Sequence, residues 1–305
     1  METIKKDNSG TLSLPENLEK LLTDCTLCPR NCHVNRMAGQ IGYCLQTGTL
    51  RAARAALHYW EEPCICGTSG SGAIFFSGCN MRCIFCQNKE ISQGGTGKTV
   101  SSRRLREIFY ELKNAGAQNL NLITPTHYTQ QLVPLLRDAP LPVVWNSVSS
   151  LKLLEGNVDV YLPDLKFSMI EPAQKYAGAP DYFETAAKAI TEMFRQTGPY
   201  QIKDGLLQRG VLIRHLILPG NLENTLGVID WIRSIFRPGD VLFSLMSQYT
   251  PYASMPFAEL NRRITKKEYI IARNYMLKKG LTEGFVQELS SAKEEYTPAF
   301  DLSGL

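Results

Sequence analysis

Three cysteines on one short segment are the residues best suited to chemistry in this sequence. Cys79, Cys83 and Cys86 lie in SGCNMRCIFCQN (77–88) with the spacing C-x3-C-x2-C, directly after the apolar run AIFFS (73–77). A fully ligated four-iron cluster normally takes four cysteine ligands. Three cysteines leave one iron open, and an open coordination position is typical of a catalytic metal site. The segment therefore predicts a 4Fe-4S cluster with one iron free to bind a reactant.

Two other sites could use the same cysteines, a zinc site or a cluster that only transfers electrons. A structural zinc ion normally needs a fourth ligand nearby, and no cysteine occurs after Cys86. The bacterial ferredoxin pattern C-x2-C-x2-C-x3-C-P has a different spacing and is absent from this sequence. The catalytic cluster is therefore preferred.

Four cysteines nearer the start form a second candidate metal site. Cys25, Cys28, Cys32 and Cys44 follow the spacing C-x2-C-x3-C-x11-C. Four ligands make a closed set, which is typical of a structural zinc ion or an auxiliary iron–sulfur cluster. The spacing does not distinguish the two metals.

The wider sequence resembles a known group of enzymes. The cysteine spacing, with Phe85 just before the last cysteine, is similar to the signature C-x3-C-x-aromatic-C of the radical S-adenosylmethionine (SAM) superfamily. A narrower resemblance, to the pyruvate formate-lyase activating enzyme homologues of the PflX family, covers nearly the whole chain from Cys25 onward. It is carried by RAARAALHYWEEPCICGTSGSGAIFFSGCNMRCIFCQNKEIS, LCPRNCHVNR, NLITPTHY, DVYLPDLKF, RHLILPGNLENT, SLMSQYTP and ELNRRITKKEY.

The resemblance implies a radical SAM oxidoreductase of the activating-enzyme class. Such an enzyme cleaves SAM reductively at its 4Fe-4S cluster, and the 5′-deoxyadenosyl radical abstracts hydrogen, here from a glycine of a partner protein. It also implies a reductant such as flavodoxin or ferredoxin. Two alternatives remain open: a radical SAM enzyme acting on a small molecule or RNA, and a non-catalytic iron–sulfur protein for electron transfer or sensing.

The resemblance also assigns candidate SAM contacts. Related activating enzymes place a D-x-K near the cofactor, which gives this role to Asp164 and Lys166, with a structural ion pair as the alternative. Arg214 matches an arginine near SAM, and a guanidinium suits bidentate carboxylate binding. The other cofactor-binding candidates are Phe85, against the adenine, and the polar residues at expected strand ends, Thr124, Asn146 and Gln248.

The sequence departs from the family pattern after Asn146. The family usually has a longer turn with a glycine–tyrosine–glutamate segment, whereas this chain runs through Val148-Ser149-Ser150 into LKLLEG. Cys64 and Cys66 are not assigned to a metal. Cys66 is expected to be a small buried hydrophobe, and Cys64 either the same or a reactive thiol.

The remaining sequence alternates strands and helices, which implies parallel, right-handed βα units. The expected fold is α/β, a partial (β/α)6 TIM-like barrel of the radical SAM type with a small N-terminal cysteine-rich extension; a doubly wound open sheet is the alternative. In both folds the site lies at the carboxyl ends of the strands.

The expected domains are 1–66, 67–295 and a C-terminal tail, 296–305. Strands are expected at 73–77, 119–124, 142–145, 158–162, 211–218, 241–245 and 284–287, and helices at 102–116, 128–137, 181–196, 222–236 and after the capping box of Thr265 and Glu268.

Composition is ordinary for a globular protein, with 44% hydrophobic and 20% charged residues. A net charge of +4 does not imply nucleic-acid binding.

No apolar run approaches the ~20 residues of a membrane helix, and METIKKDNSG lacks the core of a signal peptide. We therefore expect a cytoplasmic protein without a membrane partner, in which clustered cysteines are metal ligands rather than disulfides.

Overall fold

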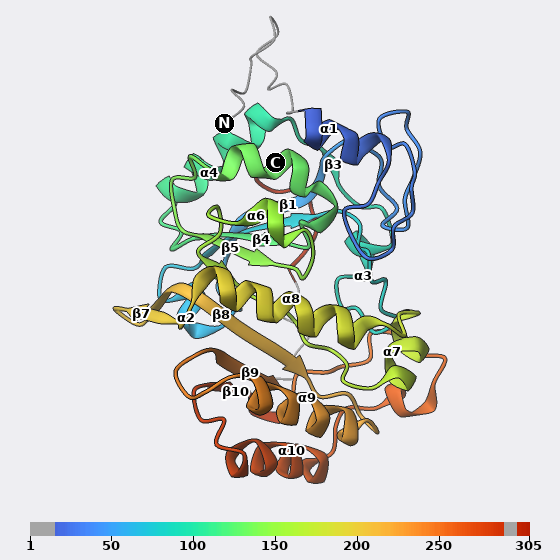
Figure 1. Cartoon of the computed structure of the whole chain (residues 1–305), viewed down its shortest axis with the longest axis vertical. Coiled ribbons are helices and arrows are strands. Elements are labelled where there is room, and N and C mark those ends of the chain that lie inside the picture. The colour runs from blue at the N-terminus through green and yellow to red at the C-terminus, as the bar shows by residue number, and fades with distance from the viewer. Residues whose placement is uncertain (1–15, 290–297) are drawn as a thin grey trace, which may run out of the picture. The chain divides into compact units, whose positions relative to one another are not determined.

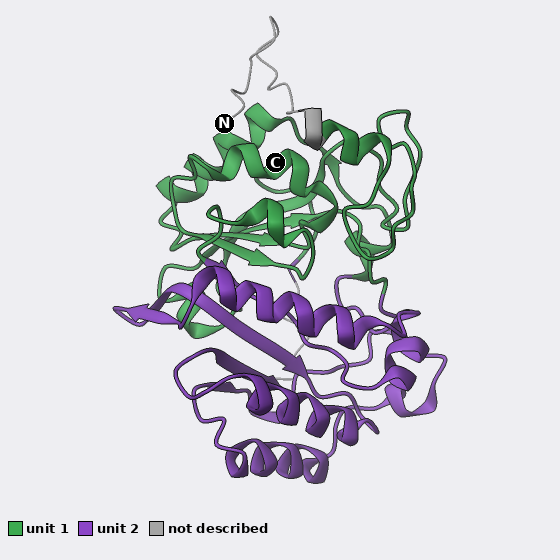
Figure 2. Cartoon of the chain, viewed as in Figure 1, with its two compact units in different colours: residues 1–82, 89–159, 299–305 green, residues 83–88, 160–298 purple. Residues whose placement is uncertain are grey.

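The computed structural model describes residues 16–289 and 298–305 of the chain (Figure 1). The chain packs as two compact units that are discontinuous in sequence (Figure 2). Unit 1 comprises residues up to 82, 89–159 and 299–305, and unit 2 comprises 83–88 and 160–298. The predicted domain boundaries after residues 66 and 295 stay predictions, since the units reflect packing rather than order along the chain.

Unit 1 contains a mixed sheet. Its strand order is β3 (Lys98–Thr99), β1 (Arg51–His58), β2 (Ser71–Phe76), β4 (Leu120–Ile123), β5 (Val143–Asn146). The expected parallel arrangement holds for β2, β4 and β5. However, β1 runs antiparallel to both β2 and β3. The described strands form an open row, as they do in unit 2.

The helices of unit 1 include the two that were expected to connect its parallel strands. Ser101 caps the first by accepting a hydrogen bond from the backbone nitrogen of Arg104. Its apolar positions, spaced for one helical face, are buried. The described helices are α1 (Glu16–Thr23), α2 (Pro63–Cys66), α3 (Lys89–Ser92), α4 (Ser102–Asn114), the 3₁₀ turn Thr126–Tyr128, α5 (Thr129–Leu136) and α6 (Leu151–Leu154).

Unit 2 contains parallel strands in the order β6 (Val160–Tyr161), β8 (Leu206–Leu216), β9 (Leu242–Met246), β10 (Gly284–Val286), and β7 (Gln201–Lys203) pairs antiparallel with β8. The expected capping box is confirmed, because the side chains of Thr265 and Glu268 each bond the other's backbone nitrogen. The helices of this unit are α7 (Ile170–Ala177), α8 (Tyr182–Thr197), α9 (Leu222–Ile235), the 3₁₀ turn Ala258–Asn261 and α10 (Lys266–Lys278).

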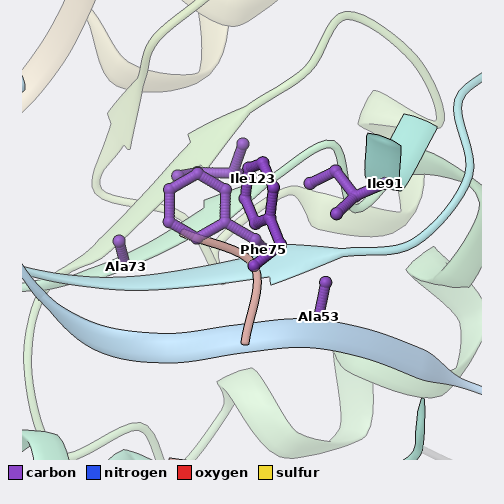
Figure 3. Close-up of a cluster of buried hydrophobic side chains, with 6 residues drawn as sticks. Ala53, Ala73, Phe75, Ile91 and Ile123 are labelled. Carbon is purple, nitrogen blue, oxygen red and sulfur yellow. The ribbon is translucent and has the colours of Figure 1, made fainter. Parts of the chain in front are cut away.

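The C-terminal residues pack into the core of unit 1. Leu302 donates a backbone hydrogen bond to Ala53, and Ser303 accepts one from Ala55, so this segment runs along β1. The segment delivers Phe300, which lies edge-on to Phe75 with ring centroids 5.4 Å apart. The buried cluster, shown in Figure 3, consists of Ala53, Ala73, Phe75, Ile91, Ile123 and Phe300.

Within residues 16–289 and 298–305, no helix has the length and apolar character needed to cross a membrane.

Candidate functional site

The first part of the three-cysteine loop follows β2 in unit 1. Gly78 has a φ of +87°, and a Cβ at this position would lie 2.5 Å from the backbone oxygen of Cys44. Glycine is therefore required here by both conformation and space. The half-buried Cys79 follows, and its Sγ accepts a hydrogen bond from the backbone nitrogen of Met81 at 3.4 Å.

The second part of the loop belongs to unit 2 and is held by two tyrosines. Ile84 donates its backbone N–H to the oxygen of Tyr176 at 2.9 Å, and the hydroxyl of Tyr252 donates to the oxygen of Ile84 at 2.6 Å. Cys86 donates its backbone N–H to the oxygen of Cys83 at 3.2 Å. Cys83 is buried and Cys86 half-buried, and neither forms a disulfide.

Phe85 anchors the same part of the loop through its ring. It lies edge-on to Phe167 and to Tyr176, with centroid separations of 6.1 and 6.4 Å, and is only 9% exposed. Edge-to-face pairs of this kind stabilise a packed aromatic cluster. The predicted adenine contact of Phe85 stays a prediction beside this packing role.

The structure brings the predicted residues Asp164, Lys166 and Arg214 together in unit 2. The carboxylate of Asp164 accepts a hydrogen bond from Arg214 Nε at 2.8 Å and one from Lys166 Nζ at 2.5 Å. Asp164 and Arg214 also form an isolated parallel β-bridge beyond the end of β6. The three side chains are between 12% and 27% exposed. They carry one net positive charge, which suits an anionic ligand.

Electrostatics keep all three groups ionised. Burial alone would raise the pKa of Asp164, but the charges of Arg214 and Lys166 outweigh burial and hold the pKa below its ordinary value. Burial would lower the pKa of Lys166, but the Asp164 carboxylate raises it above the ordinary value. At neutral pH the group therefore consists of one carboxylate and two cations. A purely structural ion pair would have the same charges.

Tyr182 and His215 bind the backbone of residues 164–166. The Tyr182 hydroxyl donates to the backbone oxygen of Asp164 at 2.5 Å and accepts the N–H of Lys166 at 3.1 Å. His215 is fully buried, with Nδ1 2.6 Å from the oxygen of Leu165 and Nε2 near a threonine hydroxyl. Burial lowers the pKa of His215 to about 4, so the ring is neutral. His215 is therefore a buried histidine in which both ring nitrogens have partners.

The strand-end candidates of unit 1 lie side by side. The backbone N–H of Thr124 donates to the oxygen of Asn146 at 3.2 Å, because β4 and β5 are parallel neighbours. Thr124 has a φ of +58°, a left-handed conformation that is uncommon outside glycine. Thr126 and Ser147 join the two strand ends again through a hydroxyl–hydroxyl hydrogen bond. The shortened turn after Asn146 thus leaves these polar groups close together.

Two buried residues near these strand ends were not among the predicted site residues. His127 Nε2 lies 2.7 Å from the backbone oxygen of Ser77, so it is the protonated nitrogen, and Nδ1 is buried without a hydrogen-bond partner. Burial lowers the pKa of His127 to about 3, helped by the charge of Arg36. The Arg36 guanidinium is 1% exposed and donates to the backbone oxygens of His127 and Thr47. The sequence places His127 after a strand, but a lone arginine in a polar segment gives no signal of burial.

Gln248 lies beyond β9 in unit 2 and is half-buried. The only hydrogen bond recorded for its amide is a long one, 4.0 Å, to the sulfur of Met246. Its neighbour Tyr249 is buried and donates its hydroxyl to the oxygen of Leu260 at 2.7 Å. Gln248 is thus the more accessible of the two, and its role toward adenosine stays a prediction.

The four N-terminal cysteines gather in unit 1. The thiols of Cys25 and Cys32 are hydrogen-bonded, and Cys28 and Cys44 lie close enough to interact electrostatically with Cys25. Burial raises the pKa of Cys44 to about 11. Among residues 16–289 and 298–305, however, no three Cys, His, Asp or Glu side chains are arranged to hold a metal ion as they stand.

Cys64 and Cys66 are buried on α2. The Cys66 thiol donates to backbone oxygens, including that of Glu61 at 3.2 Å. Burial raises the pKa of Cys64 to about 12, and the nearby Glu62 carboxylate adds to this effect. Neither thiol is activated as a nucleophile in this environment.

Comparison with known proteins matches one part of the chain to a cofactor-binding family. Residues 66–140 match the 4Fe-4S single cluster domain. This segment includes Cys79, Cys83 and Cys86.

Solved structures of SuiB from Streptococcus suis are similar to this chain at low identity. The structure bound to S-adenosylmethionine has a TM-score of 0.47 and 12% identity, covering 73% of this chain and 51% of that chain. The structure bound to the precursor peptide SuiA has a TM-score of 0.47 and 11% identity, covering 70% and 48%. The chain thus spans about half the length of these structures.

A curated relative covers most of the sequence. The uncharacterized protein MJ0674 of Methanocaldococcus jannaschii is 30% identical over 270 residues, which are 83% of this chain and 74% of the relative. Identity of this extent shows common family membership. This chain therefore belongs to the same family as MJ0674 of Methanocaldococcus jannaschii.

Proposed function

We propose that this chain is a radical SAM enzyme, which cleaves S-adenosylmethionine reductively and then removes a hydrogen atom from its substrate. One observation carries the proposal: the segment that matches the 4Fe-4S single cluster domain contains the three cysteines. Their spacing provides three iron ligands on one short loop and leaves the fourth iron open.

The residue types of the loop suit such a cluster. None of the three cysteines forms a disulfide, and thiolates are the usual ligands of iron–sulfur clusters. Gly78 lets the backbone pass Cys44 without a side chain, and Phe85 fixes the far side of the loop in an aromatic cluster. When bound, the cluster supplies one electron and an open coordination position to SAM.

Arg214 is our candidate for the SAM carboxylate. The guanidinium can bind a carboxylate through two parallel hydrogen bonds. Asp164 fixes its orientation through Nε, and Lys166 keeps the group of three positively charged. Asp164 is therefore a positioning residue for Arg214 in this proposal.

The other contacts are proposed residue by residue. Thr124 and Asn146 would offer a hydroxyl and an amide to SAM from adjacent strand ends. Phe85 and Gln248 are the candidates for contacts with the adenosine. The proposal also includes the partial (β/α)6 barrel, which the parallel runs β2–β4–β5 and β6–β8–β9–β10 support, and PflX-type membership, which rests on the sequence resemblance alone.

The proposed substrate is a glycine of a partner protein, and the proposed reductant is a flavodoxin or ferredoxin. Both follow from the sequence resemblance to activating enzymes. A glycyl-radical signal in electron paramagnetic resonance (EPR), on mixing reduced enzyme, SAM and a candidate partner, would support this substrate. Hydrogen abstraction from a small molecule or RNA, with the modified product detected by mass spectrometry, would contradict it.

The cluster is tested by iron content and EPR. Reconstituted wild type should hold about four irons at the three-cysteine loop, and added SAM should change the EPR spectrum of the reduced cluster. The triple substitution Cys79→Ala, Cys83→Ala, Cys86→Ala should lose these irons, whereas Cys66→Ala should keep them. An unchanged spectrum on adding SAM would favour a non-catalytic electron-transfer or sensing protein instead.

A further inference from the structure

The segment between α1 and β1 contains no regular structure, yet it buries Cys25, Arg36 and Cys44. Residues 24–50 form neither helix nor strand, and loops of this length without their own core are uncommon unless something else holds them. Asn31, His33 and Leu45 have φ values of 39°, 53° and 63°. Non-glycine residues with such φ values are uncommon and persist when their surroundings fix them.

The four cysteines lie within this segment and approach one another. The Sγ atoms of Cys32 and Cys44 both face Gly42, where a Cβ would lie 3.1 and 3.7 Å from them. The thiols of Cys25 and Cys32 are within hydrogen-bonding distance. Four thiolates around one zinc ion, with Zn–S bonds of about 2.3 Å, are about 3.8 Å apart. A hydrogen-bonded pair of thiols is compatible with that spacing, whereas a multi-iron cluster would separate the sulfurs further.

The segment makes direct contacts with residues that lead into the three-cysteine loop. Arg30 Nε donates to the backbone oxygen of Asn80 at 3.0 Å. The guanidinium groups of Arg30 and Arg82 lie over the ring of Tyr43, 4.1 and 5.1 Å from its centroid. The backbone oxygen of Cys44 lies against Gly78.

A second connection passes through the interior of unit 1. Arg36 donates hydrogen bonds to the oxygens of Thr47 and His127, and the His127 ring bonds the oxygen of Ser77. Both connections therefore end between Ser77 and Arg82, on either side of Cys79. These residues all belong to unit 1.

We propose that Cys25, Cys28, Cys32 and Cys44 bind a single tetrahedral zinc or iron ion, and that this ion holds residues 77–82 in place. The four thiols release their protons to solvent as four metal–sulfur bonds form. Because no three of them are in a metal-holding arrangement as they stand, binding draws the sulfurs together and tightens the turns around them. That residues 77–82 matter for activity rests on the proposed function. The proposal that the four cysteines bind a metal ion does not rest on it.

Metal content tests the site separately from the cluster. The Cys79→Ala, Cys83→Ala, Cys86→Ala triple variant should retain about one metal ion per chain without acid-labile sulfide. Adding Cys32→Ala and Cys44→Ala should remove that ion, whereas adding Cys66→Ala should not. A triple variant without metal, or one holding several irons with sulfide, would overturn the proposal.

Hydrogen–deuterium exchange tests what the ion does. Stripping wild type with a mercurial and chelator, then returning one equivalent of zinc, should raise and then restore exchange at residues 77–82 by about tenfold. Arg30→Ala should speed exchange there while keeping the ion, and Arg103→Ala, at an 89% exposed side chain, should change neither. Equal exchange in stripped and zinc-loaded protein would overturn the holding role. Protein that passes both tests but fails to cleave SAM would contradict only the proposed function.

Discussion

Arg214 and Asp164 are joined both through their side chains and through their backbones. Arg214 Nε donates to Asp164 Oδ1 at 2.8 Å, and the two residues form a parallel β-bridge. The backbone N–H of Leu165 also donates to the oxygen of Arg214 at 2.8 Å. The guanidinium is therefore positioned by β8 and by the segment that follows β6, and its direction depends on Asp164.

Asp164→Asn should destabilise unit 2 because two buried cations would lose their shared carboxylate. Breaking a fully buried pair costs about 3–5 kcal/mol, and the partial exposure of Asp164 lowers the expected loss to about 2–3 kcal/mol. Urea unfolding at pH 7 measures it. Glu171→Gln, at a 73% exposed residue paired with Lys175 at 3.8 Å, should change stability by under about 0.5 kcal/mol. Equal stability of the two variants would contradict the role given to Asp164.

His215 should make stability depend on pH. Its pKa is lowered to about 4 by burial, with Lys166 adding to the effect and Asp164 opposing it. Below the unfolded value of about 6.5, the unfolded chain binds a proton that the folded chain does not, so stability falls as pH drops from 6.5 toward 4. The loss from this residue approaches about 1.4 kcal/mol per pH unit.

Urea unfolding between pH 7.5 and 4.5 measures this dependence. His215→Gln should unfold at lower urea at pH 7.5 but show a shallower decline toward acid pH than wild type. The control His33→Gln, at an exposed histidine, should leave the urea midpoint at pH 7.5 unchanged. Parallel curves for wild type and His215→Gln would show that His215 is not buried in neutral form.

Phe300→Ala should destabilise unit 1, although only five residues follow Phe300 in the sequence. The ring fills the cluster of Figure 3 against Phe75. Removing a buried phenylalanine typically costs about 3–5 kcal/mol. Leu302→Ala, at a 38% exposed side chain in the same segment, should cost under about 1 kcal/mol. Thermal or urea unfolding compares the two, and equal losses would mean that the segment acts only through its backbone.

Regular elements with local signals were predictable from the sequence. The apolar spacing in α4 and the capping box of Thr265 and Glu268 needed only neighbouring residues. In contrast, β1 was missed. Its register shifts between Ala52 and Arg54, and such a bulge interrupts the two-residue alternation by which a half-buried strand is identified. Its arginines bond backbone oxygens of distant segments, including Arg51 to Gly95 and Arg54 to Ala299.

The candidate site could be predicted only where a motif or resemblance named its residues. Asp164 and Lys166 were named through the D-x-K of related activating enzymes, and the structure gives Asp164 an isolated bridge rather than a place in a strand. The burial of Arg36 and its bond to His127 could not be predicted, because 91 residues separate the partners and neither lies in a regular pattern. Long-range contacts of this kind depend on how the segments pack.

The most direct test of the central claim is SAM cleavage by the reduced, reconstituted enzyme under anaerobic conditions. Wild type should convert SAM to 5′-deoxyadenosine and methionine, measured by chromatography with mass spectrometry, and Cys83→Ala should form neither above background. Cys66→Ala, which leaves all three proposed ligands in place, should retain the activity. Wild type that holds four irons and is fully reduced, yet forms no 5′-deoxyadenosine, would contradict the account.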